Sequence, residues 1–440
     1  MRNKKKTAVI IAIAAAGTVM AACGSGESGS SVSSDGSASL DSGSTETAGS
    51  GERVEISVWH YFEREQEFLD TVDAYNQSQD KVHAKVTYVS RDDLMKQYTI
   101  GAVSGELPDV GMVDSPDMAS FIALGVFEDI TDEIEAWGEL DQFYPGPLSS
   151  CMDAEGRIYG LPNNSNSLAL ACNMDLLNAA GYTEPPTTWD EFAEIAAATT
   201  DPGDSVYGFA MSALSSEEGT FQFIPWLYSA GGSVDNLASE ESMKAMDFLA
   251  DLVQNGYMSK EIVNWKQADA YQAFLAQKAA MFEAGTWHIP FFDEDIGDSF
   301  HYKVALLPKD KEYSSVIGGE NFGVCAGTEH MDACIDFMKW LQSRETIGSW
   351  CSSAGKLPPR MDSLELYDAW TSDERYAVFN EELNYAVARG PHESWPTISE
   401  AIYSAEQSVI LGHSDTKTAF QDAYDTLKPI FDESPLLHQE

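Results

Sequence analysis

The stretch Val54-Glu55-Ile56-Ser57-Val58-Trp59 alternates β-branched with polar residues and predicts a β-strand. Helical periodicity over 63–77 and 91–103 is interleaved with strand patterns over 82–89 and 109–113. This β-α-β-α-β order indicates a parallel sheet whose strands are joined by crossover helices. The sequence therefore predicts an α/β fold with a ligand crevice at the carboxyl ends of the strands.

Polar and aromatic side chains follow two of these strands. His60 and Tyr61 come directly after the first strand, and Asp114 follows the third. Strand ends meet at one edge of a parallel sheet, so we expect all three residues to face the crevice. The alternatives are a core position for His60 and Tyr61 and a solvated surface position for Asp114.

Apolar patterning continues to the end of the chain, long enough for two domain-sized cores. Gly160-Leu161-Pro162 interrupts the first pattern. Thr187 or Thr188 is placed to cap a helix that begins near Trp189, and Glu191 stands at the spacing of a capping box. Further helices are predicted over 242–254, 268–277, 332–342, 399–411 and 416–428, and strands over 167–171, 303–307 and 322–325.

The N-terminal residues have the layout of a secretory signal. Basic residues precede an apolar run over 8–16, which is too short for a transmembrane helix, and Met20-Ala21-Ala22-Cys23 resembles a bacterial lipobox. We expect a signal peptide over 1–22 and a lipidated Cys23 that anchors an extracytoplasmic protein to the cell membrane. Met20 departs from the usual branched aliphatic residue, and an ordinary signal peptide that contains a cysteine is the alternative.

Residues 24–52 are almost entirely Gly, Ser, Thr, Ala and acidic residues, a composition that cannot form a core. We expect residues 23–53 to form a lipidated cysteine and a disordered tether. The whole chain has a formal net charge of −45, from 26 basic and 71 acidic residues. Such a surface repels nucleic acid and other polyanions. We therefore expect no nucleic-acid partner.

Five cysteines remain after Cys23, and their spacing fits neither a zinc site nor a small disulfide framework. We expect them to be buried apolar residues, although the sequence leaves one disulfide open. No nucleotide, zinc or calcium motif is present, so we expect neither a metal nor a cofactor. The five residues are Cys151, Cys172, Cys325, Cys334 and Cys351.

Short motifs recur in a fixed order through most of residues 54–360. They are ISVWH (56–60), GELPDV (105–110), YGLP (159–162) with CNMDLL (172–177), PTTWDEF (186–192), SAGG (229–232), FLAQKAAM (274–281) with GTW (285–287), LP (307–308) with GG (318–319), and FMKWL (337–341) with GKLP (355–358). In this order they resemble the extracellular solute-binding proteins of ABC sugar importers, the family that includes maltose-binding protein. Cys172 and Gln277 depart from the pattern, where the family has Tyr and Gly.

The resemblance implies a two-lobe periplasmic-binding-protein-like α/β fold with three inter-lobe crossings. Lobe 1 would comprise 54–160 plus 308–350, and lobe 2 would comprise 161–307 plus 351–440. The family's members capture a solute between the lobes and deliver it to the permease subunits of an ABC importer. We accordingly expect a carbohydrate ligand, an importer partner and a monomer.

A sugar site needs aromatic platforms for apolar C–H faces and planar polar groups for hydroxyls. The resemblance places Trp287 as the stacking residue and puts an aromatic from lobe 2 at Phe221 or Trp226, of which Phe221 is closer to the family's stacking position by spacing and Trp226 has a core position as its alternative. A core position is the alternative for Trp287 as well.

Further candidates lie at the predicted crossings and beyond them. Each of these residues could instead cap a turn, fill the core or lie on the surface. Glycine at 319 would let the backbone approach a ligand closely. The residues are Asn163 and Asn166 at the first crossing, Gly319, Glu320 and Asn321 after the second, and Arg360 and Trp395 further along.

Three other functions remain open. A surface glycan hydrolase needs two carboxylates at a fixed separation, and no local signature selects such a pair, so we expect no enzyme. A second alternative is an adhesion or sensing lipoprotein with the same fold. The third is a binding protein for another polar solute, such as a glycerophosphodiester, which the acidic composition weakly disfavours. The sequence does not name the sugar.

Overall fold

The computed structural model describes residues 53–62 and 65–436. The predicted signal peptide, Cys23 and nearly all of the tether lie outside the described residues. Within the described ranges, no helix combines the length and the apolar character that a membrane-spanning segment requires. The same residues contain no group of His, Cys, Asp and Glu side chains arranged to hold a metal ion.

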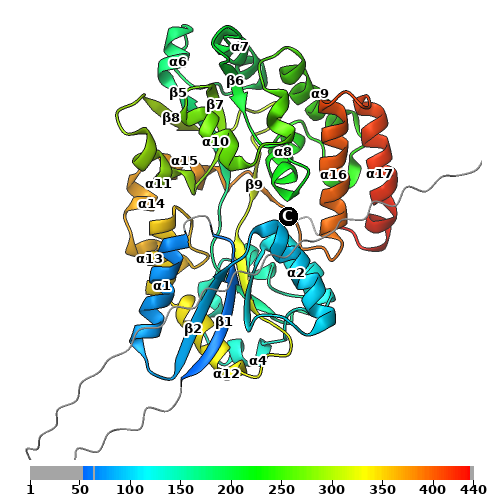
Figure 1. Ribbon diagram of the computed structural model, residues 1–440. Helices are drawn as coiled ribbons and strands as arrows, with labels where there is room; N and C mark the ends of the chain where they lie inside the picture. The colour runs from blue at the N-terminus through cyan, green and yellow to red at the C-terminus, as the bar shows by residue number, and fades with distance from the viewer. Residues whose placement is uncertain (1–52, 63–64, 437–440) are drawn as a thin grey trace, which may run out of the picture. The chain divides into compact units, whose positions relative to one another are not determined.

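The first sheet has five strands and contains the predicted β-α-β-α-β unit. Its first three strands in sequence are parallel to one another, and a later strand joins them in the antiparallel sense. β1 and β2 lie side by side, as Figure 1 shows in blue. The strands, in spatial order, are β2 (Val82–Tyr88), β1 (Val54–His60), β3 (Val110–Asp114), β10 (Glu320–Val324) and β4 (Gly160–Pro162).

A second sheet of four strands forms from the middle of the chain. Its central strands are buried on both faces, by residues such as Leu170 and Phe282, which explains their mostly apolar sequence. In spatial order they are β6 (Tyr207–Ala210), β7 (Ala279–Gly285), β5 (Leu168–Asn173) and β8 (Tyr302–Ala305), and a separate pair consists of β9 (Ser315–Ile317) and β11 (Ala386–Ala388).

Gly160-Leu161-Pro162 differs from its prediction, because it forms strand β4 and pairs with β10. A Cβ at Gly160 would lie 2.5 Å from the carbonyl oxygen of Phe322 and 2.8 Å from the methyl carbon of Met118. Glycine therefore permits the close approach of two backbones at the edge of the sheet.

The predicted helices are present, with ends shifted by at most five residues. Thr188 caps α7 by accepting from the Glu191 N–H, and the Glu191 carboxylate accepts from the N–H and hydroxyl of Thr187.

α16 and α17 pack side by side (Figure 1, orange and red). The helices are α1 (Glu65–Ser78), α2 (Arg91–Ser104), α3 (Met118–Ala123), α4 (Thr131–Glu135), α5 (Pro145–Ser149), α6 (Met174–Ala179), α7 (Trp189–Thr199), α8 (Glu217–Ser229), α9 (Glu240–Gln254), α10 (Gln267–Leu275), α11 (His288–Phe291), α12 (Met331–Leu341), α13 (Arg344–Ala354), α14 (Ala369–Ser372), α15 (Glu374–Glu382), α16 (Trp395–Ile410) and α17 (Thr416–Glu433).

α8 was not predicted from the sequence. Its residues from Gly219 to Leu227 are all buried, so the helix has no polar face, and it contains Pro225. A helix that is buried on all sides lacks the periodicity by which amphipathic helices are recognised. The N-terminal residues of α8 lie at the site described below.

The prediction of buried cysteines is confirmed. All five cysteines within the described residues are buried and unpaired. Burial raises the pKa of every one of these thiols, which keeps them protonated and unreactive.

Residues 163–167 and 315–319 both connect the two sheets, and the first of these segments is hydrogen-bonded to the second and to residues 356–358. Asn166 and Gly318 exchange backbone N–H···O bonds of 3.0 Å in both directions. Ser165 and Leu357 do the same at 2.8 and 2.9 Å. We refer to residues 163–167, 315–319 and 356–358 as the crossing segments.

Candidate functional site

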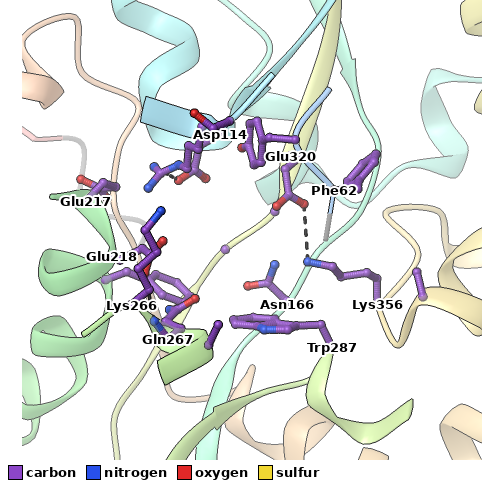
Figure 2. Close-up of a pocket in the computed structure, with 18 of the residues that line it drawn as sticks. Phe62, Asp114, Asn166, Glu217, Glu218, Lys266, Gln267, Trp287, Glu320 and Lys356 are labelled. Atoms are coloured by element: carbon purple, nitrogen blue, oxygen red, sulfur yellow. Dashed lines mark hydrogen bonds and ion pairs between the residues drawn. The ribbon is translucent and has the colours of Figure 1, made fainter. Parts of the chain in front are cut away.

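A cavity of about 190 Å³ lies where strand ends of the first sheet meet residues from α8, α10, the end of β7 and the crossing segments (Figure 2). Its wall combines aromatic rings with acidic and basic side chains. The lining residues are Tyr61, Phe62, Tyr88, Ser90, Arg91, Asp114, Asn166, Glu217, Glu218, Phe221, Lys266, Gln267, Ala268, Trp287, Phe291, Gly318, Gly319, Glu320, Trp350, Ala354, Lys356 and Arg389.

Asp114 lies at the end of β3 and is held by two arginines. The Arg91 guanidinium donates to Oδ2 at 2.6 Å, and Arg389 donates to Oδ1 and Oδ2 at 3.0 and 3.1 Å. Burial alone would raise the pKa of Asp114, but the charges of Arg389 and Arg91 outweigh burial and lower it. Asp114 lines the cavity as predicted, although it is an ion-paired residue and neither a solvated carboxylate nor a free acceptor.

Arg389 extends this network to α8. It donates to Glu217 Oε1 at 2.6 Å, and its guanidinium lies 4.5 Å from the centroid of the Phe221 ring. The indole N–H of Trp395 donates to the other Glu217 oxygen at 3.1 Å. Trp395 itself is 1% exposed and does not line the cavity, so it positions Glu217 from behind.

A third carboxyl group, Asp117, belongs to the same network and lies 3.6 Å from Arg91. Burial and the neighbouring Glu217 raise the pKa of Asp117 to about 8. Asp117 therefore keeps its proton at neutral pH.

Trp287 lies on the opposite side of the cavity, just after β7. Its neighbours are Phe221, with ring centroids 6.3 Å apart, and Lys356, whose Nζ lies 4.7 Å from the indole centroid. Lys356 Nζ also lies 3.8 Å from Glu320 Oε2, and Figure 2 marks this ion pair. Trp287 and Glu320 are thus both at the cavity, as the sequence predicted, with Lys356 between them.

His60 and Tyr61, the two residues predicted to face the crevice at the end of β1, have different positions. Tyr61 lines the cavity, and its hydroxyl is buried without a hydrogen-bond partner among the described residues. His60 is fully buried against Phe68 and does not line the cavity. Burial lowers the pKa of His60 to about 4, so the imidazole is neutral. His60 has the core position that the sequence left open.

The crossing segments supply some of the predicted polar residues. Asn166 lines the cavity, and its Oδ1 has no partner among the described residues. Gly319 also lines it, at φ +148°, where a Cβ would lie 2.2 Å from the carbonyl oxygen of Asn164. Asn163 is fully buried outside the cavity. Asn321 bonds Ser150 and lines a smaller neighbouring cavity of about 40 Å³.

Two further predicted residues, Trp226 and Arg360, also lie away from the cavity. Trp226 is 2% exposed and packs among the rings of Trp189, Phe192 and Phe209 in the core beside the second sheet. Arg360 is also 2% exposed, and its guanidinium is engaged by Asp362, Glu139 and the carbonyl oxygen of Gln342. Neither side chain reaches the cavity, because each already has its partners elsewhere.

Sequence reasoning missed most of the charged lining residues. Arg91 lies three residues after the end of β2, and Asp114 ends the parallel strand β3, so the strand-end argument would have identified Arg91 as well. Lys356 is part of the quoted GKLP motif but was given no role. Glu217 begins a helix that was not recognised. Arg389 contacts Asp114 from 275 positions away, in a region without a clear pattern.

The arrangement provides planar hydrogen-bonding groups around an aromatic ring. The carboxylates of Asp114, Glu217 and Glu320 are each paired with a cation. Buried polar atoms of Asn166 and Tyr61 have no hydrogen-bond partner within the described part of the chain. Rigid, oriented donors and acceptors next to an aromatic face are the features with which a pocket binds a small polar molecule.

Comparison with known proteins identifies the family. A family described as "Bacterial extracellular solute-binding protein" matches residues 70–378. The galactooligosaccharide-binding protein of Bacillus subtilis is 23% identical over 97% of this chain and 98% of its own length. The sn-glycerol-3-phosphate-binding periplasmic protein UgpB of Yersinia enterocolitica is 26% identical over 71% of this chain and 76% of its own.

Solved structures share the fold. A solute-binding protein of an ABC transporter from Thermotoga lettingae, bound with α-D-tagatose, has a TM-score of 0.80 at 24% identity and covers 86% of this chain and 99% of its own. Maltose-bound MalE3 of T. maritima has a TM-score of 0.78 at 20% identity, with coverages of 86% and 100%. The predicted two-lobe α/β periplasmic-binding-protein-like fold is thereby confirmed. This chain belongs to the bacterial extracellular solute-binding proteins.

Proposed function

We propose that the protein captures a sugar or oligosaccharide in the cavity and delivers it to the permease subunits of an ABC importer. The observation that carries this proposal is Trp287, an aromatic ring in a cavity whose wall also carries carboxylates, guanidinium groups and an amide. Sugars offer apolar C–H faces to such a ring and hydroxyls to such planar polar groups. The names of relatives that bind galactooligosaccharide and maltotriose support the same ligand class.

A phosphorylated solute is the second candidate, because one relative is named for sn-glycerol-3-phosphate. The charges at the cavity disfavour it. Both arginines that line the cavity are engaged by Asp114, and Arg389 is engaged by Glu217 as well. A phosphate group would therefore have to compete with buried carboxylates for each guanidinium. Hydrolysis is also disfavoured, since the family and the named relatives are binding proteins.

A thermal-shift screen tests the ligand class. A ligand that binds the folded state raises the unfolding midpoint, so a panel of neutral mono- and oligosaccharides should contain at least one sugar that raises it. Glycerol 3-phosphate serves as the comparison ligand. A shift with glycerol 3-phosphate and with no sugar would overturn the proposal, and calorimetry of the best ligand would then give its affinity.

The domain boundaries are part of the proposal. Lobe 1 consists of about 54–160 plus 308–350, lobe 2 consists of about 161–307 plus 351–440, and the lobes close around the ligand as a monomer. Lining residues from both lobes, such as Asp114 and Trp287, support this division. Small-angle scattering should show a smaller radius of gyration at saturating sugar. An unchanged radius would count against closure.

Attachment to the membrane rests on the lipobox alone. We propose that Cys23 carries lipid and that residues 24–52 act as a tether which binding does not need. Mass spectrometry of the mature N-terminus should find a lipid-modified Cys23, whereas an unmodified cysteine or another cleavage site would refute the anchor. Deletion of 24–52 should leave the affinity for sugar unchanged.

A further inference from the structure

One face of the Trp287 indole is covered by its own strand. A Cβ at Gly285 would lie 2.1 Å from Cη2, 2.1 Å from Cζ3 and 2.4 Å from Cε3 of the six-membered ring. Three adjacent carbons at nearly equal distance place the glycine beneath the face of the ring and not at its edge. A sugar can therefore stack on Trp287 only from the opposite side.

Lys356 occupies that opposite side. Its Nζ lies 4.7 Å from the ring centroid, a distance typical of a cation–π contact, and its side chain is only 12% exposed. Figure 2 shows the lysine reaching over the indole on the side of Asn166 and Glu320. The face that a sugar needs is thus occupied by one of the protein's own cations.

The backbone of Lys356 is fixed next to Trp287. Its N–H donates to the carbonyl oxygen of Cys351 at 2.8 Å, and its carbonyl accepts from the Trp370 indole at 3.1 Å. The preceding Gly355 packs against Pro290, which would lie 2.5 Å from a Cβ at that position. The ammonium group, by contrast, is held by the ring contact and by a 3.8 Å ion pair with Glu320, which is longer than a direct hydrogen bond.

The second ring at the cavity has a different cover. Arg389 lies over Phe221 at 4.5 Å, but its guanidinium is 4% exposed and bonded to both Asp114 and Glu217. Movement of the Arg389 side chain away from Phe221 would break its hydrogen bonds of 2.6–3.1 Å to Asp114 and Glu217. Movement of the Lys356 side chain away from Trp287 would break no side-chain hydrogen bond as short as these, because its ion pair with Glu320 is 3.8 Å long. Of the two covered rings, Trp287 is the one that a ligand can uncover.

We infer that Lys356 is a movable cover on the stacking face of Trp287, and that the ligand must displace it toward Glu320 before it can stack. This inference rests on the proposed function and identifies Lys356 as a residue that sets affinity by competition. A neutral, small side chain at 356 makes binding tighter, and a side chain that stacks more strongly makes binding weaker.

The cover is tested first without ligand. The full chain is labelled with 5-fluorotryptophan, and Trp287→Phe identifies the ¹⁹F resonance of Trp287. The Lys356→Ala substitution should shift that resonance and make it broaden more in the presence of a neutral paramagnetic probe, such as a small nitroxide. An unchanged resonance in Lys356→Ala would overturn the inference, whatever the protein binds.

The competition is tested with maltotriose, lactose and D-tagatose as probes. By calorimetry, Lys356→Ala should bind the best of these sugars about 2- to 10-fold more tightly than the wild type, the range that a cation–π contact of ordinary strength implies. The Lys356→Arg variant should bind more weakly, because arginine stacks well on aromatic rings. A purely structural role of Lys356 does not predict opposite effects of these two substitutions.

Lys244 provides a matched control. It lies over Trp189 at 5.8 Å and pairs with Asp310, yet it is absent from the cavity wall. The Lys244→Ala substitution should leave sugar affinity unchanged. Weaker binding by Lys356→Ala would overturn the inference and would mark Lys356 as a direct ligand contact. Failure of every sugar to bind the wild type would instead overturn the proposed function, while a shifted Trp287 resonance would still support the cover.

Discussion

The cavity and the interior beside the second sheet both contain buried carboxyl groups, but the two regions differ in whether a cation is paired with those groups. At the cavity, Asp114 and Glu217 share the guanidinium of Arg389. In the interior, Glu283 on β7, Glu382 on α15 and Glu406 on α16 form no ion pair within the described part of the chain; they are 0% exposed.

Because no cation is paired with the three interior glutamates in the described part of the chain, burial raises their pKa values. Burial raises the pKa of Glu382 to about 9. Burial also raises the pKa of Glu406. The pKa of Glu283 is raised by burial and by the nearby carboxyl groups of Glu406 and Glu382. Asp114, which is hydrogen-bonded to two guanidinium groups, therefore carries a charge, whereas the interior glutamates, which have no such bond within the described residues, carry a proton. The following predictions test this contrast and the site that depends on it.

Loss of Arg389 should have the largest effect. The Arg389→Met substitution leaves Glu217 without its ion pair and Asp114 with Arg91 alone, inside a buried site. Removing one partner of a buried pair costs about 3–5 kcal/mol of unfolding free energy, which urea denaturation at pH 7 measures.

Arg375 is the matched control for Arg389. It also bonds two carboxylates, Asp293 and Asp373, but its side chain is 23% exposed. Because solvent screens that cluster, Arg375→Met should cost only about 1 kcal/mol. Equal losses for the two variants would show that burial of the Arg389 network has no special importance.

The next largest effect concerns ligand binding. Trp287→Ala should weaken sugar affinity by about 30- to 1000-fold, the range for a central aromatic anchor, and should change the free energy of unfolding much less. Trp287→Phe should retain part of the affinity, because it keeps a stacking ring. Wild-type affinity in Trp287→Ala together with a lowered denaturation midpoint would remove Trp287 from the site.

The sequence predicted those parts of the site that depend on local pattern. Tyr61 and Asp114 reach the cavity because strand ends share one edge of a sheet, and Trp287 and Glu320 follow recognisable motifs. The partners of these residues were not predictable in the same way. Arg389 reaches Asp114 only through the folded path of the whole C-terminal region.

Aromatic residues show a second limit of sequence reasoning. Phe221 and Trp226 lie on one buried helix, α8, and apolar composition alone cannot tell which ring faces the cavity. Phe221 lines it and Trp226 packs in the core. Arg360 was an equally open choice, which its contacts with Glu139 and Asp362 decide. The fold could be predicted, whereas the pairing of side chains across it could not.

The interior glutamates predict how stability depends on pH. Their folded-state pKa values are raised above the unfolded values near 4.5, so the folded state holds more protons and loses stability as the pH rises toward 9. Each such group contributes at most about 1.4 kcal/mol per pH unit. The slope of unfolding free energy between pH 6.5 and 9 should be smaller in Glu382→Gln than in the wild type.

The chosen pH range avoids an opposing effect. Burial lowers the pKa of His60 to about 4 and that of His288 to about 3, so these imidazoles reduce stability only as the pH falls below about 6.5. Identical slopes for Glu382→Gln and the wild type above pH 6.5 would mean that Glu382 is ionised in the folded protein.

The smallest effect is expected for Glu406→Gln at pH 7. The two carboxyl oxygens of Glu406 have no hydrogen-bond partner among the described residues, and the raised pKa keeps the group neutral. Exchange for a neutral amide of the same shape should therefore cost about 1 kcal/mol or less. A loss of several kcal/mol would indicate an ionised carboxylate that binds a cation.

The pairing of the crossing segments has a consequence for the durability of the protein. The bonds between Asn166 and Gly318 and between Ser165 and Leu357 join the crossings to each other. Rotation of the lobes about these segments would leave those bonds intact, so repeated uptake cycles need no local unfolding there. Amide hydrogens of residues 165, 166, 318 and 357 should then exchange slowly with solvent, at rates that do not depend on how often the protein loads and unloads.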